Sequence, residues 1–306
     1  MKAIVGYTGF VGSNIYEGAD FDAAYNTKNI SQAYGTAPEL LVYAGLRAEK
    51  FLANNMPERD MALIHEAQRN IELINPDRLV LISTIDVFKN PVAVDETTPI
   101  DESGLHAYGY NRAQLEKWVR ANYSNALIVR LPGLFGKNIK KNFIYDYINR
   151  IPSMLKKEKL EELCKIEGEL AEYYIAQDNG FYKCRAIDED DKAHLRALFE
   201  KVNFSALSFT DSRSIYQFYP LHRLWGDITK ALDNGLTLFH PATEPLSAGE
   251  LYKYLSGGGF INEIASKPAF YDYRTAYSSL FGRDDGYIMG KDEVMREIGD
   301  FVERYK

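Results

Sequence analysis

The sequence predicts an α/β fold, a doubly wound parallel sheet followed by a smaller, α-rich C-terminal lobe. Short apolar runs alternate with amphipathic helical patterns up to about residue 140. This alternation is typical of parallel strands that helices bury on both faces. Evenly spaced glycines follow the first apolar run, and the alternation ends after Gly136.

The apolar runs are the expected strands of the sheet, and the second run is the weakest of them. They cover residues 3–5, 23–26, 39–44, 78–83 and 126–130. Apolar residues at helical spacing predict a helix over 59–74, which stops before Pro76, and another over 108–123. Because strands and helices alternate, the successive strands are expected to run parallel.

The turn after the first run has the composition of a phosphate-binding loop. Gly6, Gly9 and Gly12 precede residues from Ser13 onward that are able to form a helix. Gly6 permits a tight turn, Gly9 lets a pyrophosphate approach the backbone, and Gly12 lets the helix pack against the strand. The alternative is a glycine-rich turn that binds nothing, because such triplets also occur in ordinary loops.

The second half is more charged. Helices are expected over 156–174, 188–202 and 291–305, an extended segment over 204–218, and a helix over 247–255 that opens with a capping box. The helices over 156–174 and 188–202 are either solvated helices with one buried face or a lid. We expect a dinucleotide-binding domain over 1–140 and a substrate-binding lobe over 141–306, with residues from about 205 to 235 returning to the first domain.

Composition restricts the ligands and the compartment. The 306 residues carry a formal net charge of −7, which argues against nucleic-acid binding through phosphate contacts. Cys164 and Cys184 make no disulfide framework and suggest a reducing compartment. The first apolar run is too short for a signal peptide and no run would span a membrane, so we expect a cytoplasmic protein. The histidines are scattered, so no metal site is expected.

Residues able to move a proton follow the fourth apolar run and open the helix after it. Thr84 follows the run at 78–83, while Tyr108 and Arg112 lie four residues apart, on one helix face. A cation beside a tyrosine favours the phenolate, so the phenol is able to exchange a proton with a substrate hydroxyl. A threonine hydroxyl is able to hold the substrate oxygen. Taken singly, each residue is better explained without a catalytic role: Thr84 as the end of a strand, Tyr108 as an aromatic at a helix start and Arg112 as a solvated side chain.

Together these segments resemble the extended short-chain dehydrogenase/reductases, the nucleotide-sugar epimerase/dehydratase group. Residues 6–13 are similar to G-x-x-G-F-x-G-S, and residues 83–88 to S-[ST]-x-x-V-[YF]. Residues 95–99 resemble the family's E-x-x-P, residues 108–116 its Y-G-x-S-K-x-x-x-E, and residues 128–136 its R-x-x-x-x-[YF]-G. The strong similarity covers roughly the first 140 residues, and the second half matches only loosely.

The resemblance implies a role for each site residue. Tyr108 is then the acid/base, Thr84 positions the substrate oxygen, and Arg112 replaces the family's lysine, which tunes the tyrosine and holds the cofactor ribose. The other implied cofactor-binding residues are Gly6, Thr8, Gly9, Phe10, Val11, Gly12, Asn26, Lys28, Ala44 and Gly45. The implied substrate-binding residues are Asp86, Asn142 and Arg213, with Tyr271 and Arg274 as further candidates. The resemblance also implies a homodimer paired through the helices near 59–74 and 108–123.

Departures from the family pattern bear on activity. Arg112 replaces the lysine, Asn111 replaces the usual serine, and the family's helix asparagine falls near residues 64–65, where this chain has none. The family's dehydratases place an aspartate directly after the catalytic threonine. Ile85 stands there and cannot donate a proton, so dehydration of a sugar is disfavoured.

The cofactor and the reaction follow from these residues and the resemblance. An acid about twenty positions past the glycines would bind the ribose 2′-hydroxyl of NAD. Residues 25–29 contain none, and Lys28, unless it is a plain surface residue, would meet a 2′-phosphate, which favours NADP over NAD. The resemblance implies NAD(P)-dependent ketoreduction or epimerisation of a nucleotide-linked sugar, in surface polysaccharide or deoxysugar biosynthesis. The alternatives are a cofactor-binding sensor or scaffold without turnover, and an isomerase that keeps its cofactor bound.

Overall fold

The structure is a computed structural model that describes residues 1–305, and these form two compact units. Unit 1 comprises residues 1–139, 215–246 and 270–298. Unit 2 comprises residues 140–214, 247–269 and the described residues from 299 onward. The chain therefore passes between the units more than once, and the segment 215–246 contributes to the same unit as the N-terminus.

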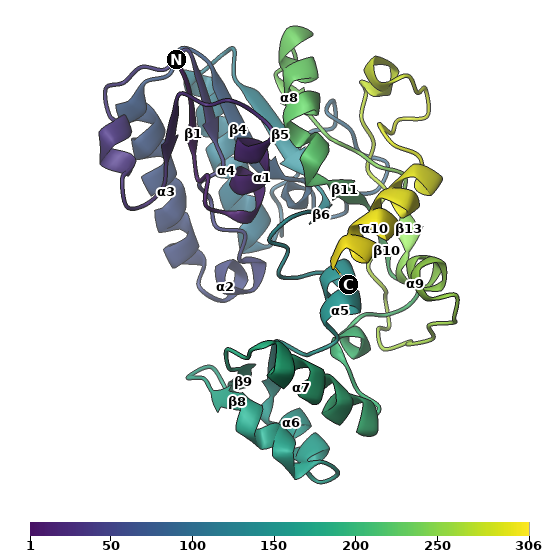
Figure 1. The fold of residues 1–306 in the computed structure, drawn as a ribbon. Coiled ribbons are helices and arrows are strands. Elements are labelled where there is room, and N and C mark those ends of the chain that lie inside the picture. Colours follow the sequence, from purple (N-terminus) through teal and green to yellow (C-terminus); the bar gives the residue numbers. More distant parts are fainter. Residues whose placement is uncertain (306) are drawn as a thin grey trace. The chain divides into compact units, whose positions relative to one another are not determined.

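Unit 1 is built on a six-stranded sheet in the order β12-β5-β4-β3-β1-β2, with every pair parallel (Figure 1). Its strands are β1 (Lys2–Val5), β2 (Ala23–Tyr25), β3 (Leu40–Tyr43), β4 (Leu79–Thr84), β5 (Leu127–Leu131) and β12 (Leu238–Phe239). The predicted fold class is confirmed, and the predicted strands lie within a residue of the observed ones at each end. Only β12, which is very short, was not predicted.

Helices cover both faces of this sheet. The connections that leave β1 and β3 run in opposite directions along the sheet, so right-handed crossovers place their helices on opposite faces. The helices of unit 1 are α1 (Phe10–Glu17), α2 (Lys50–Asn55), α3 (Pro57–Ile74), α4 (Ala107–Asn122) and α8 (Leu224–Asp233). Figure 1 shows α3 and α4 on one side of the sheet and α1 with α8 on the other. Two further short strands, β6 (Gly133–Phe135) and β11 (Phe218–Pro220), pair beside it.

The apolar pattern of α3 shows why this segment folds as it does. Its buried residues Ile64, Ala67, Ile71 and Ile74 recur at helical spacing and pack against the sheet. Pro57 occupies the first turn, where its missing N–H costs no hydrogen bond, and the chain leaves the helix through a left-handed residue just before Pro76. The predicted helix over 59–74 is confirmed.

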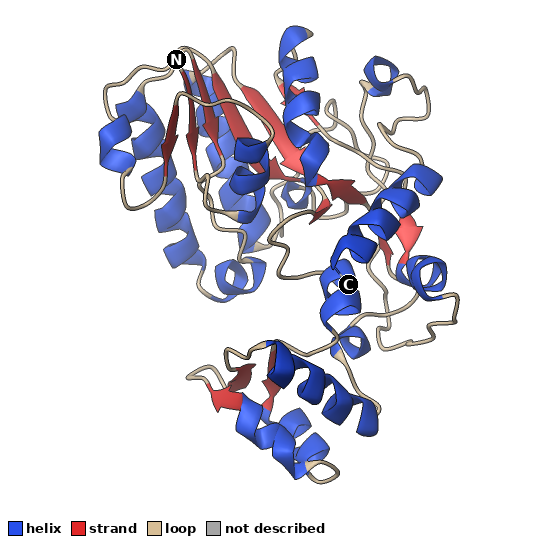
Figure 2. Ribbon diagram, viewed as in Figure 1, coloured by secondary structure: helices blue, strands red, loops and turns tan. Residues whose placement is uncertain are grey.

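Unit 2 combines helices with a small antiparallel sheet of order β7-β9-β8 (Figure 2). Its strands are β7 (Met154–Lys156), β8 (Tyr174–Ala176) and β9 (Phe181–Cys184), and its helices are α5 (Phe143–Asn149), α6 (Lys157–Cys164), α7 (Glu189–Lys201) and α9 (Ala248–Ser256). The remaining elements of the chain are β10 (Ile215–Tyr216), β13 (Leu246–Ser247) and α10 (Lys291–Tyr305).

The predictions for the second half are partly confirmed. The helix over 291–305, the helix over 188–202 and the capping box at 247–250 are present. The single helix over 156–174 is wrong, because α6 ends at Cys164 and a 3₁₀ turn at Gly168–Tyr173 leads into β8. The segment over 204–218 is also not simply extended, since Ala206–Phe209 forms a 3₁₀ turn. Aromatic and β-branched residues at 173–175 favour the strand over a continued helix.

None of the helices in residues 1–305 is long and apolar enough to cross a membrane. In the same range, no group of His, Cys, Asp and Glu side chains is arranged to hold a metal ion.

Candidate functional site

The order of the strands places a crevice at the carboxyl ends of β1 and β3. The sheet continues from β1 to β2 on one side and from β3 to β4 on the other, so the connections diverge at this point. Ligands of open α/β sheets bind in the crevice that such a divergence leaves. The predicted site residues Gly6 and Ala44 follow β1 and β3 directly.

The glycine turn depends on two close backbone approaches. Gly6 has a φ of +90°, and a Cβ there would lie 2.5 Å from the carbonyl oxygen of Ala44. A Cβ on Gly12 would lie 2.1 Å from the carbonyl oxygen of Gly6. Both positions therefore require glycine, the first for the turn beside β3 and the second for the packing of α1.

The N-terminus of α1 is open in the way that a phosphate group needs. Gly9 is the residue that precedes the helix and has no side chain to cap it, and Thr8 and Gly9 are exposed. Phe10 and Val11 form the first turn and are half-buried. The first N–H groups of a helix have no partner within the helix, and its dipole attracts anions. This cradle fits the pyrophosphate of a dinucleotide.

The turn after β2 presents Asn26 and Lys28. Asn26 Oδ1 accepts from the Lys28 N–H at 2.9 Å, and the Asn26 N–H donates to Asn29 Oδ1 at 2.7 Å. These bonds fix the backbone of the turn, while the Lys28 side chain is exposed and forms no ion pair among the described residues. The turn holds a cation and no carboxylate.

Close packing of α4 on the loop after β4 brings the predicted catalytic residues together. A Cβ on Gly109 would lie 2.1 Å from the carbonyl oxygen of Asp86, so only glycine allows the helix to begin this close. His106 caps α4, with its Nδ1 accepting the Gly109 N–H at 3.0 Å. The Tyr108 N–H donates to Asn54 Oδ1 on α2 at 3.0 Å, so an asparagine absent from the sequence prediction does hold this helix start.

Thr84 and Arg112 both contact Tyr108. The Thr84 hydroxyl lies near enough to the phenol to lower its pKa, and the Arg112 guanidinium carbon lies 3.9 Å from the centre of the tyrosine ring. Thr84 Oγ1 also accepts the Asp86 N–H at 3.2 Å, so its proton is available to the phenol oxygen. Burial raises the pKa of Tyr108 above its ordinary value, while Arg112 and the Thr84 hydroxyl act in the opposite direction. The structure brings these three predicted residues into one cluster.

Arg112 is fixed by partners that the sequence prediction missed. The side chain is 3% exposed, and its Nη1 donates to Asp60 Oδ2 on α3 at 2.5 Å. Its Nη1 also donates to the carbonyl of Tyr108, and its Nη2 to the carbonyl of Arg47, at 3.2 and 2.8 Å. The amide of Asn111 donates to the same Asp60 oxygen at 2.8 Å. The sequence did contain a signal for Asp60, because this charged residue lies four residues before Ile64 and therefore on the apolar face of the predicted helix.

Asp86 anchors a polar wall beside the cluster. Its Oδ1 lies 3.0 Å from Lys50 Nζ and accepts the Tyr271 hydroxyl at 3.2 Å. Burial raises the pKa of Tyr271 well above its ordinary value, and the Asp86 charge adds to this effect. Tyr271 is one of the substrate candidates from the sequence, whereas the sequence analysis did not single out Lys50.

The predicted substrate residues Asn142 and Arg213 belong to unit 2, unlike the other predicted site residues. Asn142 caps α5, with Oδ1 accepting the Ile144 N–H at 2.9 Å. Arg213 pairs with Asp211 through two hydrogen bonds of 3.0 and 2.7 Å and donates to the carbonyl of Ala265. Both side chains therefore stabilise unit 2 locally, and their contact with substrate remains a proposal.

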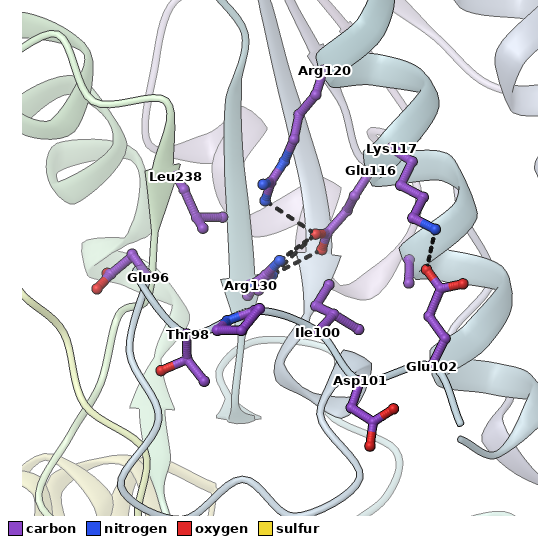
Figure 3. A pocket seen from close by; sticks show the side chains of 12 residues that line it. Glu96, Thr98, Ile100, Asp101, Glu102, Glu116, Lys117, Arg120, Arg130 and Leu238 are labelled. Carbon is purple, nitrogen blue, oxygen red and sulfur yellow. Dashed lines mark hydrogen bonds and ion pairs between the residues drawn. The ribbon is translucent and has the colours of Figure 1, made fainter. Parts of the chain in front are cut away.

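A cavity of about 350 Å³ also lies in unit 1, lined by residues of α4, β5 and the loop at 96–102 (Figure 3). Thr84, Tyr108 and Arg112 do not line it. Several of its charged groups are paired: Arg130 binds both carboxylate oxygens of Glu116, which also accepts the Ser83 hydroxyl at 2.5 Å, and Lys117 pairs with Glu102. The cavity therefore lies beside the buried Arg130–Glu116 ion pair, and we do not count it as part of the candidate site.

The comparisons with known proteins identify the fold. A scan against protein-family models and a search of curated proteins found no match. Among solved structures, the chain is similar to dTDP-4-dehydrorhamnose reductase from Bacillus anthracis in complex with NADP, at 17% identity, 99% coverage of both chains and a TM-score of 0.63. It is also similar to the Bordetella bronchiseptica enzyme WbmG in complex with NAD and UDP, at 12% identity, coverage of 99% and 94%, and a TM-score of 0.65.

A third similar structure is a variant of UDP-glucuronic acid 4-epimerase from Bacillus cereus, in complex with NAD and a UDP-linked 4-deoxy-4-fluoro sugar acid. The identity is 13%, all of both chains is covered, and the TM-score is 0.59. The chain has the fold of these enzymes. Such low identities leave the reaction to be argued from the residues themselves.

Proposed function

We propose that this protein binds NAD(P) across the carboxyl ends of β1 and β3 and reduces a keto group of a nucleotide-linked sugar. The observation that carries the proposal is the cluster of Thr84, Tyr108 and Arg112 beside the crevice. Arg112 links the two parts of the site, because it donates to the carbonyl of Arg47 in the loop after β3. Ala44 of that loop packs against Gly6 of the glycine turn.

The cofactor proposal rests on the fit of the glycine turn. Gly6 and Gly12 make a turn that no larger residue would allow, and Gly9 leaves the N–H groups of α1 open to phosphate. The similar structures contain NADP in one case and NAD in two. The exposed Lys28 and the lack of a carboxylate after β2 favour NADP, because a cation would neutralise its 2′-phosphate.

The substrate proposal rests on the fold and on the polar wall beside Tyr108. All three similar enzymes carry names or ligands of nucleotide sugars or nucleotides. Asp86, held by Lys50 and Tyr271, offers a carboxylate oxygen to sugar hydroxyls. Asn142 and Arg213 are proposed to contact the nucleotide diphosphate. The pathway we propose is surface polysaccharide or deoxysugar biosynthesis.

In the proposed reaction, the protein supplies the proton and the orientation of the carbonyl. Bound NADPH would supply the hydride to the carbonyl carbon. Tyr108 would donate its phenolic proton to the carbonyl oxygen, and Thr84 would hold that oxygen by a hydrogen bond. Arg112 would stabilise the phenolate that remains after proton transfer.

The protonation of Tyr108 favours reduction over epimerisation. Burial raises the pKa of Tyr108, so the phenol holds its proton at neutral pH and serves as an acid. Epimerisation through a keto intermediate begins with removal of a proton from a sugar hydroxyl, for which the phenolate is required. The charge of Asp60 beside Arg112 acts in the same direction as burial.

Turnover measurements test the proposal. The protein is mixed with NADPH or NADH and a panel of 4-keto nucleotide sugars, with Tyr108→Phe as the control variant. Net loss of the reduced cofactor that depends on Tyr108 supports the reductase. Formation of an epimer without net loss of cofactor would assign an isomerase instead.

The second candidate is a cofactor-binding sensor or scaffold without turnover. The observation that favours it is the replacement of the family's lysine by Arg112, which is committed to Asp60 and two carbonyl groups. Tight cofactor binding, without turnover across the panel and unaffected by Tyr108→Phe, would support it. For the assembly we propose a homodimer through α3 and α4, which sedimentation of the purified protein would test, and for the compartment the cytoplasm.

A further inference from the structure

We propose that Asp60 is a positioning residue of the catalytic cluster. Its buried carboxylate holds Arg112 over the Tyr108 ring and offsets the guanidinium charge, so that Tyr108 stays protonated until a ketone binds. The inference deepens the proposed ketoreduction and rests on it, because Asp60 would keep Tyr108 in the protonated form that donates a proton to a ketone.

The geometry ties the two helices α3 and α4 together through one oxygen. Asp60 Oδ2 accepts from Arg112 Nη1 at 2.5 Å and from the Asn111 amide at 2.8 Å, while the Asn111 amide also donates to the carbonyl of Pro57. All three side chains are nearly inaccessible to solvent, with Asp60 6% exposed and Asn111 and Arg112 each 3% exposed. The bonds fix α3 to the turn of α4 that carries Tyr108.

The stacking of Arg112 is a consequence of these bonds. A guanidinium has donors only in its plane, and here the donors are used on Asp60, on the Tyr108 carbonyl and on the Arg47 carbonyl. The guanidinium carbon lies over the phenol ring, 3.9 Å from its centre, and the bonded nitrogens donate to groups other than the phenol oxygen. The positive charge of Arg112 stabilises the phenolate form of Tyr108, and the negative charge of Asp60 partly offsets this effect.

The field at the phenol comes from every element packed around it. The titratable and charged groups of this surround are Lys50 on α2, Asp60 on α3, Asp86 after β4, and His106 and Arg112 on α4. Arg112 lowers the pKa of Tyr108, whereas the two carboxylates raise it. Burial lowers the pKa of His106, so this side chain is uncharged at neutral pH. Lys50 is paired with Asp86. Of the two carboxylates, Asp60 is the one that is paired with Arg112.

A buried ion pair is weak evidence for a role in stability, because replacing both partners is often neutral. Asp60→Asn tests the charge while keeping an oxygen of the same shape for the two donors. The matched control is Asp227→Asn, since Asp227 is equally buried and accepts the phenol of Tyr219 at 2.6 Å, outside the site. The conservative variant Asp60→Glu retains the charge.

The readout is the titration of the Tyr108 phenol, followed by ultraviolet difference absorbance between each protein and its Tyr108→Phe counterpart. We expect Asp60→Asn to move the midpoint to lower pH by about one unit, and Asp227→Asn and Asp60→Glu to leave it near the wild-type value. A midpoint that stays or rises in Asp60→Asn would overturn the inference. If that variant does not fold, Asp60→Ser, which is smaller and neutral, carries the same expectation and the same refutation.

This measurement needs neither substrate nor cofactor, so it separates the two proposals. If the midpoint shifts but the protein turns over no keto sugar, the ketoreductase proposal is refuted and the role of Asp60 is supported. If the midpoint does not shift but the protein is an active reductase, only the proposed role of Asp60 is refuted. In an active enzyme, the pH above which reduction declines is expected to fall by the same amount in Asp60→Asn, with little change in KM.

Discussion

Substitution of Gly109 by alanine tests the packing that brings Tyr108 to Thr84. The added methyl group would lie 2.1 Å from the carbonyl oxygen of Asp86, which belongs to the backbone and has no rotamer to change. Carbon and oxygen atoms that do not bond rarely approach closer than about 3 Å, so the first turn of α4 must move by about 1 Å. The same turn carries Tyr108, while Thr84 stays on β4.

The displacement gives the magnitude of the effect. A misplacement of about 1 Å in a catalytic group lowers the rate by roughly 100-fold. Overpacking costs about 1–3 kcal/mol of unfolding free energy, of which better helix propensity restores up to about 1 kcal/mol. We therefore expect Gly109→Ala to remain folded with a small loss of stability, to bind the cofactor at the glycine turn, and to lose nearly all turnover.

The chain offers a matched control for this substitution. Gly226 lies within α8, is exposed, and would place a Cβ in open space. Gly226→Ala should raise the unfolding free energy by about 0.5–1 kcal/mol and leave kcat unchanged. Both variants are measured by urea denaturation, by cofactor titration and by kcat. Full activity in Gly109→Ala would refute the claim that this contact positions Tyr108.

Further predictions concern the cofactor, the buried ion pair and acid stability. Lys28→Ala should weaken binding of NADPH by about 5- to 10-fold and leave NADH unaffected, as measured by fluorescence titration, and an equal loss for both would contradict the 2′-phosphate contact. Arg130→Met leaves the buried Glu116 with only the half-exposed Arg120, at 3.6 Å, as a cationic partner. It should lower the unfolding free energy in urea by about 3–5 kcal/mol, whereas a loss below about 1 kcal/mol would count against the pair. Burial lowers the pKa of His240 from 6.5 to about 3. The unfolded chain therefore binds more protons than the native protein between these values. As the pH is lowered across this window, the unfolding free energy should decrease by up to about 1.4 kcal/mol per pH unit, and less steeply in His240→Gln.

The strands of unit 1 could be predicted because a buried parallel strand leaves a continuous apolar run. β4 and β5 are almost wholly buried, and their sequences contain little else than aliphatic residues. The strands of unit 2 have no such signal, since β7, β8 and β9 are short and contain few buried residues. Their pairing depends on contacts between segments far apart in the sequence, which a local pattern does not contain.

The motif residues of the site could be predicted, but the residues that hold them could not. Gly6, Gly12 and Gly109 stand in motifs, and in each case the structure supplies a backbone atom that excludes a side chain. Asn54 and Asp60 stand in no motif and act through contacts across helices. Of the two, only Asp60 is indicated by the sequence, because it is a charged residue on the apolar face of a helix. A carboxylate is buried at such a position only when it has a partner.

The two departures at positions 111 and 112 are best understood as one bonded set. Each on its own argues against activity, since the family's serine and lysine are both missing. In the structure, both replacements donate to the same oxygen of Asp60. A lysine at 112 would present a point charge on a single nitrogen, in place of the guanidinium that lies over the Tyr108 ring and donates from two nitrogens to Asp60 and to the carbonyl of Arg47. Asp60, Asn111 and Arg112 therefore depend on one another, and reverting Arg112 to lysine alone should impair the site that it superficially restores.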